Sequence, residues 1–122
     1  MLLCFAVYKC AVSPTGDKLY ITNNSQHKLL TLARNGSVLA TFTDPALQGP
    51  RGIHVTPAGQ VLVIGAQSNT ILQIDSEGKR KLATLVTQKA GLVNPRSVCY
   101  NRHTASIIVG SLNSTILVFK VK

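Results

Sequence analysis

The fold is decided by the stretch PRGIHV at residues 50–55, which recurs as PRSVCY at residues 95–100. The two stretches lie 45 residues apart (95 − 50), and the offset continues without a gap into the segments that follow. Two further pairs of apolar segments align in the same register: residues 61–65 with 106–110, and residues 70–74 with 115–119. Because one register holds at three separate places, these two parts of the chain are copies of one structural unit.

A more diverged copy precedes them. The sequence VSPTG at residues 12–16 matches VTPAG at residues 55–59 at an offset of 43 (59 − 16). After one extra residue near Lys18 the offset becomes 42 (78 − 36). Each copy reads as a short strand, a glycine turn, a second strand, a polar loop and a third strand. In the first two copies a second glycine turn leads to a fourth strand, at residues 37–42 and 79–86.

The pattern of apolar residues predicts an all-β fold. Short apolar runs separated by Gly, Asn, Ser and Pro recur throughout, and no segment of helical length carries an apolar stripe of helical period. A period of 42 to 45 residues with four short strands per unit is typical of β-propeller blades. We predict one domain, 1–122, built from blades of four antiparallel strands. The three repeats are expected at approximately residues 8–49, 50–94 and 95–122.

The order of the motifs resembles an NHL repeat. The motifs are Pro-Arg-Gly-Ile-His-Val, then Gly-Gln-Val-Leu-Val, then Ser-Asn-Thr-Ile-Leu-Gln-Ile-Asp-Ser-Glu-Gly. They are most similar to the C-terminal NHL propellers of tripartite-motif proteins, over roughly residues 8 to 122. This resemblance implies a six-bladed ring that recognises the substrates of a ubiquitin ligase. It therefore implies a non-catalytic binding module for a protein or for single-stranded RNA.

Three repeats amount to half of a six-bladed ring, and they would leave two open faces of apolar sheet. The apolar residues 1–7 are predicted to form a strand that completes a preceding blade. We expect the remaining blades to come either from a longer chain or from a second copy paired head to tail with the first.

Charge and cysteine content limit the partners. The chain has 13 Lys and Arg residues against 4 Asp and Glu residues, for a formal net charge of +9. That charge favours phosphate backbones, acidic proteins or anionic lipids and does not choose among them. No stretch approaches the roughly 18 apolar residues of a membrane helix, so no membrane partner is expected. The 3 cysteines show no C-x-x-C spacing, which favours a reducing compartment, and we expect a cytoplasmic protein.

Catalytic motifs are missing from the sequence. It contains no Gly-x-Ser-x-Gly, and its acidic residues fall in turns or loops and not in pairs at strand starts. We therefore predict that the chain is not an enzyme and uses no cofactor or metal. Cys10 and His54 are assigned to packed strand positions, because small or apolar residues occupy the equivalent positions in other repeats. Two alternatives remain: a fragment of a propeller hydrolase or lyase, and a purely structural scaffold.

In a propeller, the loops between the second and third strands and those that lead into the next repeat share one face. Here they carry amides and basic residues, which suit phosphate and base-edge contacts to single-stranded RNA, or contacts to a peptide. Arg51 and Arg96 are the leading candidates, because both directly follow Pro in the repeat. The predicted ligand-binding residues are Asn23, Gln26, His27, Lys28, Arg51, Gln67, Asn69, Lys89, Arg96 and Asn113.

Overall fold

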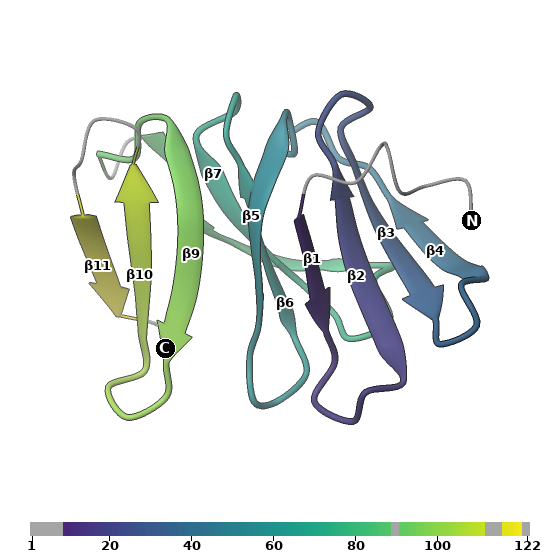
Figure 1. Cartoon of the computed structure of the whole chain (residues 1–122). Coiled ribbons are helices and arrows are strands. Elements are labelled where there is room, and N and C mark those ends of the chain that lie inside the picture. The colour runs from purple at the N-terminus through teal and green to yellow at the C-terminus, as the bar shows by residue number, and fades with distance from the viewer. Residues whose placement is uncertain (1–8, 89–90, 112–115, 121–122) are drawn as a thin grey trace.

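The computed structural model describes residues 9–88, 91–111 and 116–120, which form eleven strands in three antiparallel sheets (Figure 1). The first sheet contains β1 (Lys9–Val12), β2 (Lys18–Asn23), β3 (Lys28–Ala33) and β4 (Val38–Phe42). The second contains β5 (Pro50–Val55), β6 (Val61–Gly65), β7 (Thr70–Ile74) and β8 (Lys81–Val86). The third contains β9 (Pro95–Asn101), β10 (Ser106–Ser111) and β11 (Ile116–Lys120). The all-β prediction is confirmed.

Each sheet is a meander in which neighbouring strands follow one another along the chain. The predicted fourth strands of the first two repeats are present as β4 and β8. Within the described residues the third sheet has three strands, and the strand predicted at residues 1–7 lies outside them. The turn between β5 and β6 uses glycine because it requires a positive φ, which is 88° at Gly59. No helix in the described residues is long and apolar enough to cross a membrane.

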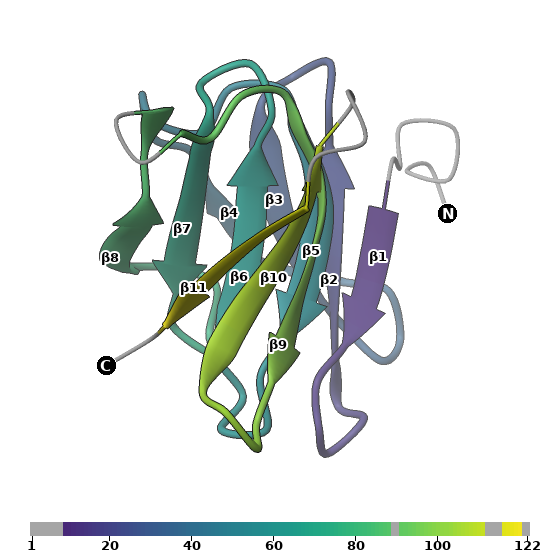
Figure 2. The same ribbon diagram turned by 90° about the vertical axis from the view of Figure 1, so that its left-hand side faces the viewer.

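The middle sheet is buried on both faces. Figure 2 shows the three sheets one behind another, with β6 between β10 and β3. All five residues of β6 are buried, and successive side chains point to opposite faces of the sheet. Val61 and Val63 pack in the core against the first sheet, and Leu62 and Ile64 pack in the core against the third. A strand that supplies two cores needs apolar residues on both of its faces, which explains why β6 is a continuous apolar run.

A glycine brings the second and third sheets close together along their first strands. A Cβ atom at Gly52 on β5 would lie 2.8 Å from the Arg96 carbonyl oxygen and 3.0 Å from the Ser97 Cα atom. It would also lie 2.9 Å from the Ile64 Cδ1 atom. The backbone of β9 therefore occupies the space that a side chain at residue 52 would need.

The outer faces of the first and third sheets carry exposed residues, although Ile21, Leu30 and Leu32 form a buried cluster on the outer face of the first sheet. Cys10 and Cys99 are both exposed, so the prediction that Cys10 is packed is wrong. The equivalent residues of the middle repeat, Ile53 and His54, are half-buried because a sheet lies on each side of the middle sheet, whereas Cys10 and Cys99 point away from it. Val118, which lies beside Ile108 on the same face as Cys99, is 62% exposed.

Replacing Gly52 with alanine tests the close approach of β5 and β9. Because the new methyl group would meet backbone atoms that cannot rotate away, we expect the free energy of unfolding in urea to fall by about 1–3 kcal/mol. Ser97 is the equivalent residue of the third repeat and is exposed. Ser97→Ala is therefore the matched control, and it should change the free energy by no more than about 0.5 kcal/mol. Equal effects of the two substitutions would contradict this packing.

Candidate functional site

The loop end is the end of the molecule that carries the loops between β2 and β3, between β4 and β5, and between β6 and β7 (Figure 1). These loops are joined by hydrogen bonds across large separations in sequence. The Asn24 side chain donates to the Pro50 carbonyl oxygen at 3.1 Å, and the Gln48 backbone N–H donates to the Ser68 hydroxyl at 3.1 Å. The sequence prediction that these loops gather at one end is therefore confirmed.

The same hydrogen bond occurs twice at this end. His27 and Asn69 occupy equivalent repeat positions, and both have the left-handed backbone conformation, with φ of 58° and 54°. The His27 Nδ1 atom accepts from the Gly49 N–H at 2.8 Å, and the Asn69 Oδ1 atom accepts from the Asn94 N–H at 2.9 Å. Gly49 and Asn94 are themselves equivalent, and both have positive φ. Each bond fixes a loop to the residue directly before the next repeat.

The amides of the first loop are occupied within the loop itself. The Asn23 Oδ1 atom accepts from the Gln26 N–H at 3.1 Å and from the Ser25 hydroxyl at 3.2 Å. The Asn23 side-chain amide donates to the Gln26 Oε1 atom at 3.3 Å. These groups hold the loop in shape, so their polarity alone does not identify them as ligand contacts.

Arg51 and Arg96 lie at the starts of β5 and β9, as predicted, and both are half-buried. The Arg51 carbonyl oxygen accepts from the Thr22 hydroxyl at 3.3 Å, which ties β5 to the first sheet. The Arg96 Nε atom is buried without a hydrogen-bond partner in the described part of the chain. A buried donor without a partner is costly, by about 1–3 kcal/mol or more for a charged group.

The remaining predicted residues are scattered. Lys28 begins β3 opposite Asn23 and is half-buried. Gln67 is exposed, and its backbone N–H donates to the Gln48 carbonyl oxygen at 2.9 Å. Lys89 and Asn113 lie outside the described residues. The loop end therefore brings Asn23, Gln26, His27 and Lys28 into one group, and it places Arg96 on another blade.

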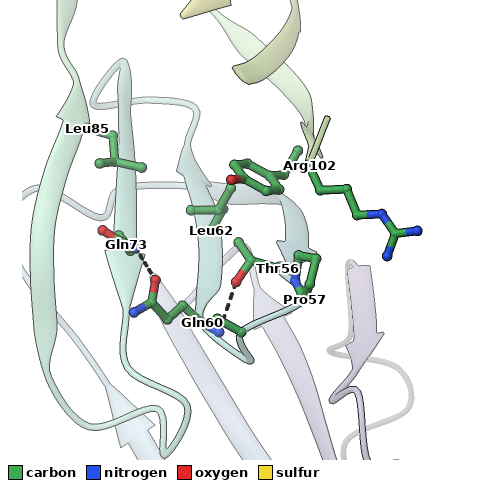
Figure 3. Close-up of a pocket in the computed structure, with 9 residues that line it drawn as sticks. Thr56, Pro57, Gln60, Leu62, Gln73, Leu85 and Arg102 are labelled. Carbon is green, nitrogen blue, oxygen red and sulfur yellow. Dashed lines mark hydrogen bonds between the residues drawn. The ribbon is translucent and has the colours of Figure 1, made fainter. Parts of the chain in front are cut away.

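A second site at the opposite end was not predicted from the sequence. A hollow of about 340 Å³ lies between the second and third sheets, close to the turns that follow β5 and β9 (Figure 3). It is lined by Thr56, Pro57, Ala58, Gln60, Leu62, Gln73, Leu85, Tyr100 and Arg102. The sequence does contain a signal for this hollow. Tyr20 of the first repeat aligns with Leu62 of the second, so the second repeat has a smaller side chain at this position.

His54 lies on β5 directly across from Leu62, on the face that looks toward the third sheet. Burial lowers the pKa of its imidazole from the usual value of 6.5, because desolvation penalises the charged form.

Within the described residues no group of three or more His, Cys, Asp and Glu side chains is placed to hold a metal ion.

Comparison with solved structures shows a propeller fold. Hydrazine synthase of Kuenenia stuttgartiensis has a TM-score of 0.80 and 20% identity over 95% of this chain and 33% of that chain. Virginiamycin B lyase of Staphylococcus aureus has a TM-score of 0.65 and 20% identity over 99% of this chain and 43% of that chain. A catalytically inactive histidine-to-alanine variant of that lyase with quinupristin has a TM-score of 0.64 and 20% identity over 94% and 41%. This chain therefore spans less than half of each.

These likenesses correct one prediction and leave another untested. The prediction that the chain is not an enzyme is wrong, because a synthase and a lyase are among the proteins that share this fold. That exclusion relied on catalytic motifs within one chain, whereas a propeller can assemble one site from several blades. No protein-family model and no curated protein matches the sequence, so the resemblance to NHL repeats stays a prediction. At 20% identity the likeness establishes the fold alone.

The repeated loop hydrogen bond can be tested by exchanging residues between repeats. His27→Ala leaves the buried Gly49 N–H without its acceptor, so we expect the free energy of unfolding to fall by about 1–3 kcal/mol. His27→Asn copies the acceptor of the second repeat, and asparagine tolerates a left-handed backbone. It should keep most of the stability. If urea titrations find the two variants equally destabilised, the His27 side chain does not fix this loop.

Stability should also depend on His54. Its pKa is lower in the folded than in the unfolded protein, so the unfolded chain takes up a proton first as the pH falls. The free energy of unfolding should therefore decrease as the pH drops below about 6.5, in the range where histidine titrates. His54→Gln removes the titrating group and should flatten this part of the pH profile. Identical profiles for the two proteins would exclude the effect.

Proposed function

We propose that this chain is a section of a β-propeller enzyme of the hydrolase or lyase kind, and that its loop end binds an anionic group of a small substrate. The observation that carries the proposal is the buried Arg96 Nε atom without a partner. The Nε–H group of this guanidinium is shielded from water and has no acceptor among the described residues, so it can donate to a carboxylate or phosphate oxygen.

The surroundings of Arg96 support binding with little rearrangement. The loops at this end are fixed by the hydrogen bonds from Gly49 to His27 and from Asn94 to Asn69. Asn94 comes two residues before Arg96, so its bond to Asn69 also holds the start of β9. Groups held in place before binding lose little conformational entropy when a ligand arrives, which favours a small and specific site.

The formal charge of +9 adds long-range attraction for an anion. Catalytic groups are not assigned to the described residues, and in this proposal the rest of the ring contributes them. The chain spans 41% to 43% of the lyase chains that it resembles, so a substrate site between blades would draw on residues beyond it.

A module that binds a protein or single-stranded RNA was the main prediction from the sequence, and one feature counts against RNA recognition. RNA-binding faces of this kind use aromatic rings on which bases stack, each contributing about 1–3 kcal/mol. In the described residues, Tyr20, Phe42, Tyr100 and Phe119 all lie within strands. The loop end therefore offers basic and amide groups without a described stacking platform.

Titration with inorganic phosphate tests the proposal, followed by NMR of the arginine Nε–H groups. We expect the Arg96 signal to shift and saturate, because its donor gains an acceptor. Arg34 lies exposed after β3 and serves as the internal comparison. Arg96→Gln should abolish the saturable response, and the matched Arg34→Gln should leave it intact. A uniform, non-saturating response of all arginines would overturn the anion site.

Labelled oligouridylate provides the second arm of this test. Under the substrate proposal, binding to the RNA should be weak and should disappear as the salt concentration rises. Tight binding that persists in Arg96→Gln would instead favour a nucleic-acid module.

A further inference from the structure

We propose that the hollow between the second and third sheets binds a small, one-ring aromatic amide. This site lies at the end of the molecule opposite the loop end, and it is independent of the proposed function above. The repeats themselves provide the comparison that sets this hollow apart, because the chain contains two equivalent interfaces between sheets.

The interface between the first and second sheets has a smaller space at the same position. That space has a volume of about 210 Å³ and is lined partly by Tyr20 and by the turn at Pro57–Gly59. Tyr20 is fully buried, and its hydroxyl donates to the Ser76 carbonyl oxygen at 2.6 Å. In the next interface Leu62 takes the equivalent position, and the hollow is about 340 Å³. A volume of that size falls at the lower end of the range of ligand sites, about 300–1,000 Å³.

The floor of the hollow is apolar. Leu62 is buried, while Leu85 and Tyr100 are half-buried and pack against the core between these two sheets. Arg102 lies at the edge of the hollow, and Figure 3 shows its side chain extending away from the other labelled residues. The floor therefore suits a planar apolar ring, and the charge of Arg102 stays in solvent.

One wall carries a pair of side-chain amides. The Gln73 Nε2 atom donates to the Gln60 Oε1 atom (Figure 3). The Gln60 backbone N–H donates to the buried Thr56 hydroxyl at 3.2 Å, which fixes the position of Gln60. Whichever amide donates, the pair leaves one NH₂ group and one carbonyl oxygen, and within the described residues neither has another partner. The hollow therefore presents a donor and an acceptor beside an apolar floor.

This combination selects a ligand of definite chemistry. A primary amide on an aromatic ring has its own donor and acceptor, so it can satisfy both free groups while its ring covers the floor. A carboxylate of the same shape accepts hydrogen bonds only, and it would meet the free carbonyl oxygen with its own oxygen. The site should therefore prefer the amide to the acid. The first interface lacks such a pair, because Lys18 and Thr31 stand where Gln60 and Gln73 stand in the second.

Nicotinamide is the probe, and nicotinate is its charged counterpart. Titration with nicotinamide, followed by NMR of the side-chain NH₂ signals, should give saturable shifts of Gln60 and Gln73. Nicotinate should bind at least tenfold more weakly. No saturable shift of these signals at millimolar nicotinamide, or equal affinity for both probes, would overturn the proposal.

Variants that exchange residues between repeats locate the site. Leu62→Tyr introduces the side chain that occupies the first interface and should lower the affinity at least tenfold. Gln73→Thr copies the first repeat, removes half of the amide pair and leaves the hollow open, so it should weaken binding even if Leu62→Tyr does not fold. Tyr20→Leu enlarges the first interface, where Lys18 and Thr31 lie, and should not create a second site. Wild-type affinity in Gln73→Thr, or a new site in Tyr20→Leu, would contradict recognition by the amide pair.

Discussion

The packing of apolar side chains on both faces of the middle sheet is the interaction on which the rest of the structure depends. Every residue of β6 is buried, and successive residues join different cores. Burying apolar surface supplies roughly 25 cal/mol per Å², and β6 collects this contribution on both of its faces. The first and third sheets each pack against a neighbouring sheet on one face. On their other faces Val12 and Val118 are exposed, while Ile21, Leu30 and Leu32 form a separate buried cluster in the first sheet.

This double burial also places the two candidate sites. The sheets approach closely along their first strands because Gly52 has no side chain, which puts the start of β9 beside β5 and Arg96 near the loop end. Toward the opposite end the spacing depends on which side chain fills the gap. Tyr20 occupies it in one interface, and Leu62 leaves more of it open in the other. The repeat therefore provides one scaffold with two local variants.

Sequence reasoning identified the strands because a repeat reports the same element more than once. The offsets of 42 to 45 residues predicted β5, β6 and β7 and their third-repeat counterparts β9, β10 and β11 close to their observed bounds. The sequence did not reveal which groups the polar loop residues contact. His27 and Asn69 accept hydrogen bonds from backbone groups 22 and 25 residues away, and such pairing depends on how the repeats stack. The exposure of Cys10 was missed because the repeat alignment takes no account of which sheets have a neighbour on both sides.

The hydrogen exchange rates of the backbone amides test the central claim most directly. If burial on both faces of the middle sheet holds the structure together, then the amides of β6 and β7 should be the slowest to exchange, at the free energy of global unfolding. The amides of β2, β3 and β10 should exchange faster through partial opening of the outer sheets. Protection that is highest in the first or third sheet, or uniform across all three, would contradict the claim.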